Sequence, residues 1–232
     1  MQPGVPFNQS IRVDSRRFAV YHLSSCGVDY YREADKSTCP VSGRRTAGTA
    51  DQMSISTRSG DHGTTGLRYN RRVAKNHPRV EALGCVDELN AALGLARAHT
   101  SDARLAARLQ DIQRDLLRLM GELATDPADR ERHQRDGFPV VDAALTARLD
   151  QWVAELEPEP GRFSTWALPG PPPAAAALEL ARTLCRRAER AACALSESHG
   201  LPNREMLAYL NRLADVLWLF ARLAEAPGGR PG

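Results

Sequence analysis

The sequence predicts an all-α protein: an antiparallel bundle of five helices, four long and one shorter, preceded by an irregular N-terminal segment. Apolar residues recur at intervals of three and four from Pro78 onward, which is the spacing of a helix with one buried face. Few segments carry strand signals. With 232 residues, 42% of them hydrophobic and 25% charged, the chain is large and apolar enough to bury a sizeable core.

Five segments carry the helical pattern. The first begins at Pro78, the third is the shorter one, and the fourth is rich in alanine and follows a proline-rich break at 168–173. The expected helices cover residues 78–96, 105–123, 145–156, 174–196 and 203–225. Residues 126–140 and 157–173 form the longer connections, where functional sites often lie.

The N-terminal part of the chain differs in character from the rest. Residues 1–52 mix Arg, Ser, Gly and Pro and keep neither the strand nor the helix period, so we expect a disordered extension. Met53 is a plausible second start, and we expect residues 53–232 to form the functional domain, with a short irregular tail at 226–232.

Charge and hydropathy exclude several classes of function. The net charge is +3, and residues 53–232 are nearly neutral without a basic stripe, so a nucleic acid partner is not expected. No stretch reaches the roughly 18 apolar residues of a membrane span, and no apolar segment follows a basic start as in a secretory signal. A cytoplasmic protein is therefore expected.

The five cysteines are odd in number and lack C-x-x-C spacing. Reduced thiols are the favoured interpretation over disulfides or zinc, with three of them packed on helices. These three are Cys85, Cys185 and Cys193.

The first candidate site is the Gly/Thr-rich segment at 57–66. Three glycines at three-residue spacing let backbone N–H groups turn inward around an anion, and the interleaved hydroxyls can donate to phosphate. A polyphosphate is the natural ligand, although such a segment taken alone is more often a flexible loop. Lys75 follows, and apart from Lys36 it is the only lysine of the chain. A compact cation suits a phosphate contact, but chance retention of one lysine is an equal explanation.

The second candidate lies on the first long helix. Asp87 is flanked on the helix surface by Gly84, Ala91 and Gly94, so only small side chains surround it. Another chain segment is expected to approach closely there. Tight packing between helices of the bundle is the alternative explanation.

The third candidate is a row of arginines on one helix face. Arg182, Arg186 and Arg190 stand four residues apart with Glu189 beside them, while the opposite arc is apolar. Like charges at this spacing repel, so an anionic ligand or an acidic group across an interface is expected to relieve them; a solvated face is the alternative. That apolar arc comprises Leu180, Leu184, Ala188, Ala191 and Leu195. On the last helix, Asn211 and Asp215 sit among leucines and are expected to have polar partners.

Taken together, these motifs resemble the PduO-type ATP:cob(I)alamin adenosyltransferases. The resemblance extends in order over residues 55–223. It is carried by the segment 57–66, Lys75, Val86-Asp87-Glu88-Leu89-Asn90, Leu168-Pro169-Gly170, the run 186–190 and the run 209–215. It implies a homotrimer of five-helix bundles with active sites between subunits.

The resemblance also implies roles for individual residues. ATP, accompanied by Mg²⁺, would be bound by Thr57, Arg58, Ser59, Gly60, Thr65, Gly66, Lys75, Arg186, Arg187, Glu189, Arg190 and Asn211. Of these, Arg186, Arg190 and Asn211 would act in catalysis. Asp87 would pair with Arg182 across the subunit boundary, in keeping with the view that Arg182 lacks a partner on its own helix. Trp166 would face the corrinoid.

The implied reaction is attack of the Co(I) centre of a reduced corrinoid on the 5′ carbon of ATP, which gives adenosylcobalamin and inorganic triphosphate. A reductase that supplies the electron and a B12-dependent acceptor enzyme are possible partners. Four positions depart from the family pattern, namely Arg58 for Lys, Trp166 for Phe, Pro171 for Gly and Glu179 for His. The alternative function is a helical scaffold that uses its arginine face for a protein partner. A ferritin-like di-metal bundle is set aside because no Glu-x-x-His occurs.

Overall fold

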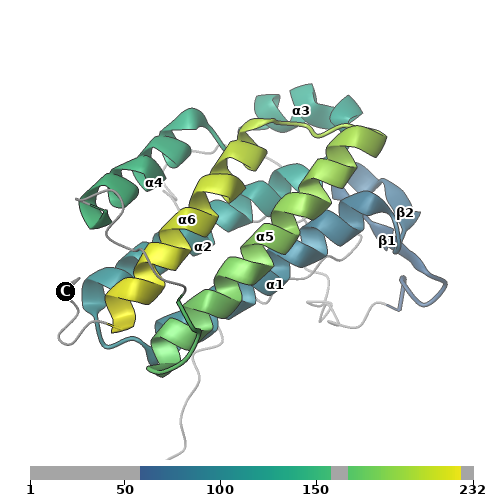
Figure 1. Ribbon diagram of the computed structural model, residues 1–232. Helices are drawn as coiled ribbons and strands as arrows, with labels where there is room; N and C mark the ends of the chain where they lie inside the picture. Colours follow the sequence, from purple (N-terminus) through teal and green to yellow (C-terminus); the bar gives the residue numbers. More distant parts are fainter. Residues whose placement is uncertain (1–57, 158–166, 226–232) are drawn as a thin grey trace, which may run out of the picture.

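The computed structural model describes residues 58–157 and 167–225 of the chain. Five helices form the expected bundle, four of them long and one shorter (Figure 1). They are α1 (Pro78–His99), α2 (Ala103–Leu123), α4 (Ala143–Leu156), α5 (Pro173–His199) and α6 (Glu205–Glu225). The expected N-terminal extension, the C-terminal tail, Thr57 and Trp166 lie outside the described residues.

Each helix of the bundle packs against one or two neighbouring helices. Helix α1 packs against α2 and α5, and α6 packs against α5 and α4. Helices α1 and α2 run in opposite directions, as do α5 and α6 (Figure 1). Asp102 and Asp142 mark the beginning of α2 and α4, because their side chains accept hydrogen bonds from backbone N–H groups in the first turn of each helix. The core is the apolar face that the three-and-four spacing predicted, and its largest members include Leu89, Leu93, Leu109, Ile112, Leu116, Leu119 and Phe220.

Several elements differ from the sequence-based expectation. Strands β1 (Thr64–Gly66) and β2 (Arg72–Ala74) form an antiparallel hairpin around a 3₁₀ turn at Arg68–Asn70. A second 3₁₀ turn (Pro127–Asp129) and helix α3 (Arg130–Arg135) lie in what was expected to be a plain connection. Elements of three to six residues are too short to show a period, which is why the sequence did not reveal them.

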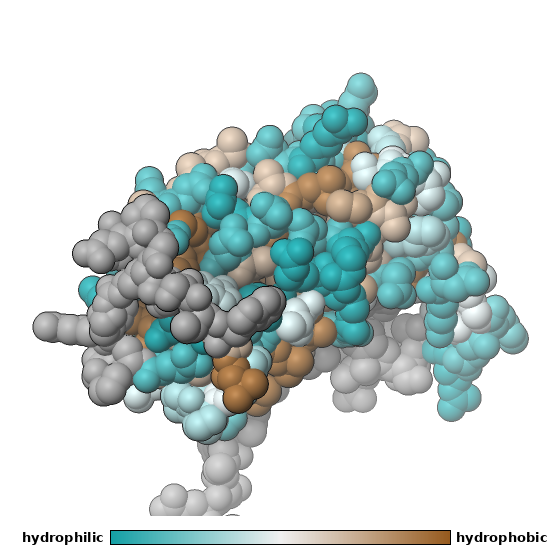
Figure 2. Space-filling model, in the orientation of Figure 1, coloured by the Kyte–Doolittle hydropathy of each residue, from teal (hydrophilic) through white to brown (hydrophobic). Residues whose placement is uncertain are grey.

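The apolar arc expected on α5 is correct only in part. Ala188 and Leu195 are buried, whereas Leu180 is 48% exposed. Leu168, in the connection that precedes α5, is 89% exposed. Figure 2 shows hydrophobic residues on the surface over the lower end of α5. The start of α5 therefore presents apolar surface that this chain does not cover with its described residues.

A polar cluster lies inside the bundle. The carboxylate of Asp115 on α2 pairs with Arg148 of α4 and accepts a hydrogen bond of 2.9 Å from the Tyr209 hydroxyl of α6. Asp115 and Tyr209 are buried. Burial raises the pKa of Asp115, and the Arg148 charge and the Tyr209 hydrogen bond oppose that rise. This cluster ties three helices together at one point.

The cysteines were predicted correctly in two cases of three. Cys85 and Cys185 are buried free thiols, and burial raises the pKa of both. Cys193 is also free but exposed on α5, so the expectation that it packs was wrong. Within the described ranges, no helix has the length and apolar character needed to span a bilayer.

His133 on α3 is a second buried polar group. Its Nδ1 lies 3.1 Å from the Thr125 hydroxyl oxygen, and its ring stacks on Phe138. Burial lowers the pKa of His133, and the positive charge of Arg68 acts in the same direction. The folded protein therefore favours the neutral imidazole.

This burial predicts a dependence of stability on pH. The unfolded chain takes up the His133 proton near the ordinary pKa of about 6.5, before the folded state does, so stability falls as the pH drops below that value and until the lowered folded pKa is reached. We expect the free energy of unfolding to fall more between pH 7 and pH 5 in the wild type than in His133→Asn. Urea unfolding at the two pH values measures the difference. Equal losses in the two proteins would contradict a neutral buried His133.

Candidate functional site

The Gly/Thr-rich segment leads into β1 at the open end of the β1–β2 hairpin, opposite the connecting turn at Arg68–Asn70, and this open end is called the tip below. Two turns shape it, with Asp61 N–H donating to the Arg58 carbonyl and Gly63 N–H donating to the Gly60 carbonyl, each at 3.2 Å. Gly63 has φ +75°, a conformation that favours glycine. The hairpin then closes in register, with Thr65 opposite Val73. The segment therefore has a defined turn geometry, with Thr64 and Thr65 projecting to opposite faces of the strand.

The structure brings Lys75 to this tip, as the sequence suggested. A Cβ atom placed on Gly60 would lie 3.2 Å from the Lys75 Nζ and 3.2 Å from its Cε, closer than ordinary contact. The absence of a side chain at Gly60 lets the lysine lie close against the loop. The Lys75 N–H donates to the Gly63 carbonyl at 2.9 Å, whereas its side chain has no hydrogen bond or ion pair with residues 58–157 or 167–225. Its ammonium group is available to an anion beside Gly60.

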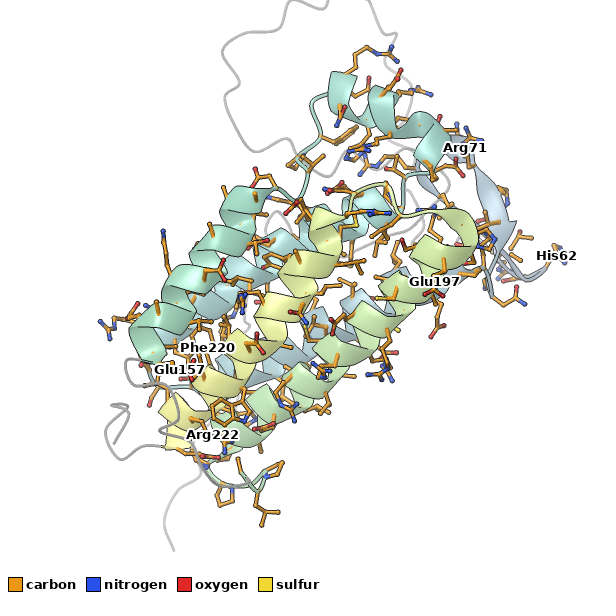
Figure 3. The ribbon with its side chains drawn as sticks, turned by 45° about the horizontal axis from the view of Figure 1, so that its top comes forward. His62, Arg71, Glu157, Glu197, Phe220 and Arg222 are labelled. Atoms are coloured by element: carbon orange, nitrogen blue, oxygen red, sulfur yellow. The ribbon has the colours of Figure 1, made fainter. Side chains whose placement is uncertain are left out.

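The connecting turn of the hairpin, called its base below, is attached to the end of the bundle. The Arg68 N–H donates to the Ala124 carbonyl at the end of α2 at 2.8 Å, and the Arg68 guanidinium lies 4.0 Å from the centre of the Phe138 ring. Arg71 forms an ion pair with Asp129. His62, at the tip, projects away from the helices (Figure 3). The hairpin is therefore held at its base and presents its tip outward.

A second polar cluster lies between α5 and α6. Asn211 donates a hydrogen bond of 3.0 Å to the Glu189 carboxylate, whose other oxygen lies 4.0 Å from Arg186 Nη1. Arg190 is exposed and has no polar partner among the described residues. Arg186, Glu189 and Asn211, which the sequence assigned to one site, thus contact one another between two helices. On the same helix as Asn211, Asp215 has its expected partner in Arg212, at 3.1 Å.

Arg187 points elsewhere. It forms an ion pair with Glu88 of α1, although the sequence grouped it with the ATP-binding arginines. Glu88 was not assigned a role from the sequence. No signal could have revealed it, because the partner lies on a different helix about a hundred residues away.

The expectation that Arg182 lacks a partner on its own helix was wrong. Its Nε donates to the Glu179 carboxylate at 2.7 Å, and the other oxygen of Glu179 accepts from Arg222 of α6 at 2.8 Å. Glu179 is 4% exposed, so its charge depends on these two arginines. Figure 3 shows Arg222 near the end of α6, facing α5. Glu179, one of the four departures noted above, thus replaces an expected histidine with an anion that fixes Arg182.

The face around Asp87 is open within one chain. Asp87 is exposed and has no polar partner in the described ranges, and a Cβ atom on Gly84 would meet nothing within 4 Å. Gly94, about two turns beyond Asp87, does face α2, where a Cβ atom would lie 3.6 Å from the Gln113 amide nitrogen. Packing inside the bundle therefore explains Gly94 but leaves Gly84 and Asp87 unexplained.

The structure keeps the hairpin tip and the arginine face apart within one chain. The His77 and His199 rings lie 4.5 Å apart, which places the hairpin at the C-terminal end of α5. Arg186 stands 13 residues before His199, and a helix of that length spans about 20 Å. Within one chain, Arg186 therefore lies about 20 Å along α5 from the end that contacts His77.

Comparison with known proteins places the chain in a family. The family model described as cobalamin adenosyltransferase matches residues 55–224. The chain is 40% identical over 174 residues to a corrinoid adenosyltransferase PduO of Salmonella typhimurium; the match covers 75% of this chain and only about half, 50%, of that protein. It is 40% identical over 178 residues to a cobalamin adenosyltransferase of Cupriavidus metallidurans, covering 75% of this chain and 90% of that protein.

Solved structures agree. A variant PduO-type ATP:corrinoid adenosyltransferase from Lactobacillus reuteri, complexed with cobalamin and ATP, aligns with a TM-score of 0.65 at 35% identity, covering 73% of this chain and 89% of that one. Another variant, complexed with ATP, aligns with a TM-score of 0.66 at 34% identity, covering 74% and 93%. The chain therefore belongs to the cobalamin adenosyltransferase family.

Proposed function

We propose that this protein transfers the 5′-deoxyadenosyl group of ATP to the Co(I) centre of a reduced corrinoid, giving adenosylcobalamin and inorganic triphosphate. The contact between Arg186, Glu189 and Asn211 carries the proposal, because it places a cation, an acceptor and an amide on one exposed patch of a family member. The ATP complexes of the Lactobacillus relatives support the choice of ATP as the nucleotide substrate.

The proposed reaction needs no nucleophilic side chain from the protein. Cobalt supplies the electron pair that forms the Co–C bond, and the bond from C5′ to the triphosphate oxygen breaks with its electrons leaving on the triphosphate. Catalysis then consists of aligning cobalt and carbon and neutralising the leaving group. Arg186, Arg190 and Lys75 are the cations proposed for the triphosphate, and Asn211 with Glu189 is proposed to orient the nucleotide.

Mg²⁺ is proposed to accompany ATP. The described residues hold no cluster of three or more His, Cys, Asp or Glu that would bind a metal by themselves. Mg²⁺ commonly binds through substrate phosphates and waters with few protein ligands, which suits a triphosphate held by the oxygen-rich tip around Thr64 and Thr65. When bound, it would add positive charge to the triphosphate.

The active unit is proposed to be a homotrimer with the site between subunits. Three observations support this proposal: the distance between hairpin tip and arginine face, the open face at Gly84 and Asp87, and the exposed Leu180 at the start of α5. Asp87 of one subunit would approach Arg182 of the next. Arg182 uses its Nε for Glu179, so its terminal nitrogens remain for this second carboxylate.

Asp87→Asn is expected to weaken the assembly by about 2 kcal/mol, since the Arg182 terminal nitrogens lose their counter-charge but Glu179 still compensates the guanidinium. Mass photometry over a dilution series measures the assembly. A double-mutant cycle with Arg182→Gln should be non-additive; additive losses would contradict a direct contact. Exchanging the charges is a poor rescue here, because Arg182→Asp would set a carboxylate beside the buried Glu179.

Further parts of the proposal concern residues and partners beyond the described site. Trp166 is proposed to pack against the corrinoid and exclude its lower axial ligand, which eases reduction of the cobalt. A reductase that supplies the electron and a B12-dependent acceptor enzyme are proposed as partners, and the cytoplasm as the location.

The test is an anaerobic assay with chemically reduced cobalamin and MgATP, in which formation of the Co–C bond is followed by its spectral change. We expect one triphosphate released for each adenosylcobalamin formed. ATP should also stabilise the protein against heat. Absence of both product and ATP-dependent stabilisation would overturn the proposal and favour a scaffold that uses the arginine face for a protein partner.

A further inference from the structure

We infer that Arg72 is a positioning residue that holds the hairpin tip in its anion-binding conformation before the nucleotide arrives. The inference rests on the proposed function, in which this tip receives the triphosphate. Arg72 Nη2 donates a hydrogen bond of 2.7 Å to the Ser59 carbonyl and also contacts the Thr64 hydroxyl. One guanidinium thus joins the two ends of the segment 60–63.

The strand register explains why Arg72 reaches both groups. Thr64 is opposite Ala74 and Gly66 is opposite Arg72, so Thr64 and Arg72 are diagonal neighbours on the same face of the hairpin. A diagonal pair is within reach of a long side chain. The guanidinium fork then presents several donors in fixed directions, which a lysine cannot reproduce.

The contacts of Arg72 with Ser59 and Thr64, called the Arg72 clamp below, matter because few other interactions hold the segment 60–63. It contains Gly60 and Gly63, residues with the greatest backbone freedom, and its backbone hydrogen bonds are two turns of 3.2 Å and one bond of 2.9 Å from the Lys75 N–H to the Gly63 carbonyl. The Lys75 side chain crosses Gly60 without a polar partner among the described residues and so depends on the loop below it for its position. Fixing a loop in its bound conformation reduces the ordering cost of binding.

The neighbouring residue provides a matched control. Arg71 is also exposed and lies next to β2, but its guanidinium pairs with Asp129 at the base of the hairpin and contacts nothing at the tip. Both substitutions to alanine remove one exposed arginine and one set of polar contacts. Only Arg72→Ala releases the segment 60–63.

The experiment has two measurements on the full-length protein. Amide hydrogen exchange without ATP should accelerate severalfold at Asp61, Gly63 and Lys75, whose N–H groups bond within the loop, in Arg72→Ala and not in Arg71→Ala. Titration with MgATP should give a Kd about tenfold weaker for Arg72→Ala, equivalent to about 1.4 kcal/mol, and a partial loss for Arg72→Lys. In turnover, KM for ATP should rise with kcat little changed.

Thr64→Val completes a double-mutant cycle with Arg72→Ala. It should weaken ATP binding in the wild type but have little further effect in Arg72→Ala, since the clamp is already lost. Unchanged exchange together with weaker ATP binding would mean that Arg72 contacts the phosphates directly and would overturn the positioning role. Equal behaviour of the Arg71 and Arg72 variants would overturn it as well. Failure of the wild type to bind MgATP would instead refute the proposed function, while the exchange measurement would still decide whether the clamp exists.

Discussion

Replacing Arg186 or Arg190 by alanine is expected to lower the rate of adenosyl transfer roughly ten- to a hundredfold. Each charge-assisted contact with a phosphate contributes about 1.5–3 kcal/mol, and a tenfold change in rate corresponds to about 1.4 kcal/mol. Both side chains lie on the exposed face of α5, so their removal should leave the packing of the core unchanged. The turnover assay with MgATP and reduced cobalamin measures the loss, and circular dichroism checks that the helices remain.

The matched control is Arg135→Ala, which removes an exposed arginine from α3, away from this face. It should leave turnover near that of the wild type. Arg186→Lys should recover part of the rate, because the charge is kept while the fork is lost. Wild-type turnover in Arg186→Ala and Arg190→Ala would remove these residues from the site.

The largest loss of stability is expected for Asp115→Ala. This change leaves the Arg148 guanidinium without its carboxylate and the buried Tyr209 hydroxyl without its acceptor. Removing one partner of a buried ion pair costs about 3 kcal/mol, which corresponds to a drop in Tm of roughly 5–10 °C for a domain of this size. Thermal unfolding followed by circular dichroism measures the drop.

Asp111→Ala is the control on the same helix. Asp111 is half exposed and pairs with Arg114 one turn away, an arrangement that contributes less than about 1 kcal/mol. Tyr209→Phe, which removes only the hydroxyl, should cost about 1 kcal/mol. If Asp115→Ala lowered Tm no more than Asp111→Ala, the buried cluster would not stabilise the bundle.

Some features of this protein follow from local sequence patterns, and others depend on contacts between distant parts of the chain. The long helices were predicted because each repeats its apolar spacing many times, and Pro78 marked the first residue of α1. The residues of the arginine row and Asn211 indicated that each needs a polar partner, and the family resemblance implied the grouping of Arg186, Glu189 and Asn211. The Gly/Thr segment and Lys75 were recognised from residue types suited to phosphate.

The hairpin could not be foreseen in the same way. Strands of three residues are stable here because their base is bonded to Ala124 and paired with Asp129, both far along the chain. The role of Arg72 depends on strand register, which places it diagonally to Thr64. Neither relation leaves a period in the sequence.

What the sequence by itself determined is therefore the set of helices, the side of each helix that is buried, and the residue types that suit a triphosphate, because these follow from spacing along one chain segment. Tertiary structure alone decided which charges pair. It gave Arg222 to Glu179, Arg187 to Glu88 and Arg148 to Asp115, and it left Leu180 exposed at the start of α5. The physical reason is that an ion pair needs two groups within about 4 Å, and that separation is set by how the helices pack rather than by the spacing within any one of them.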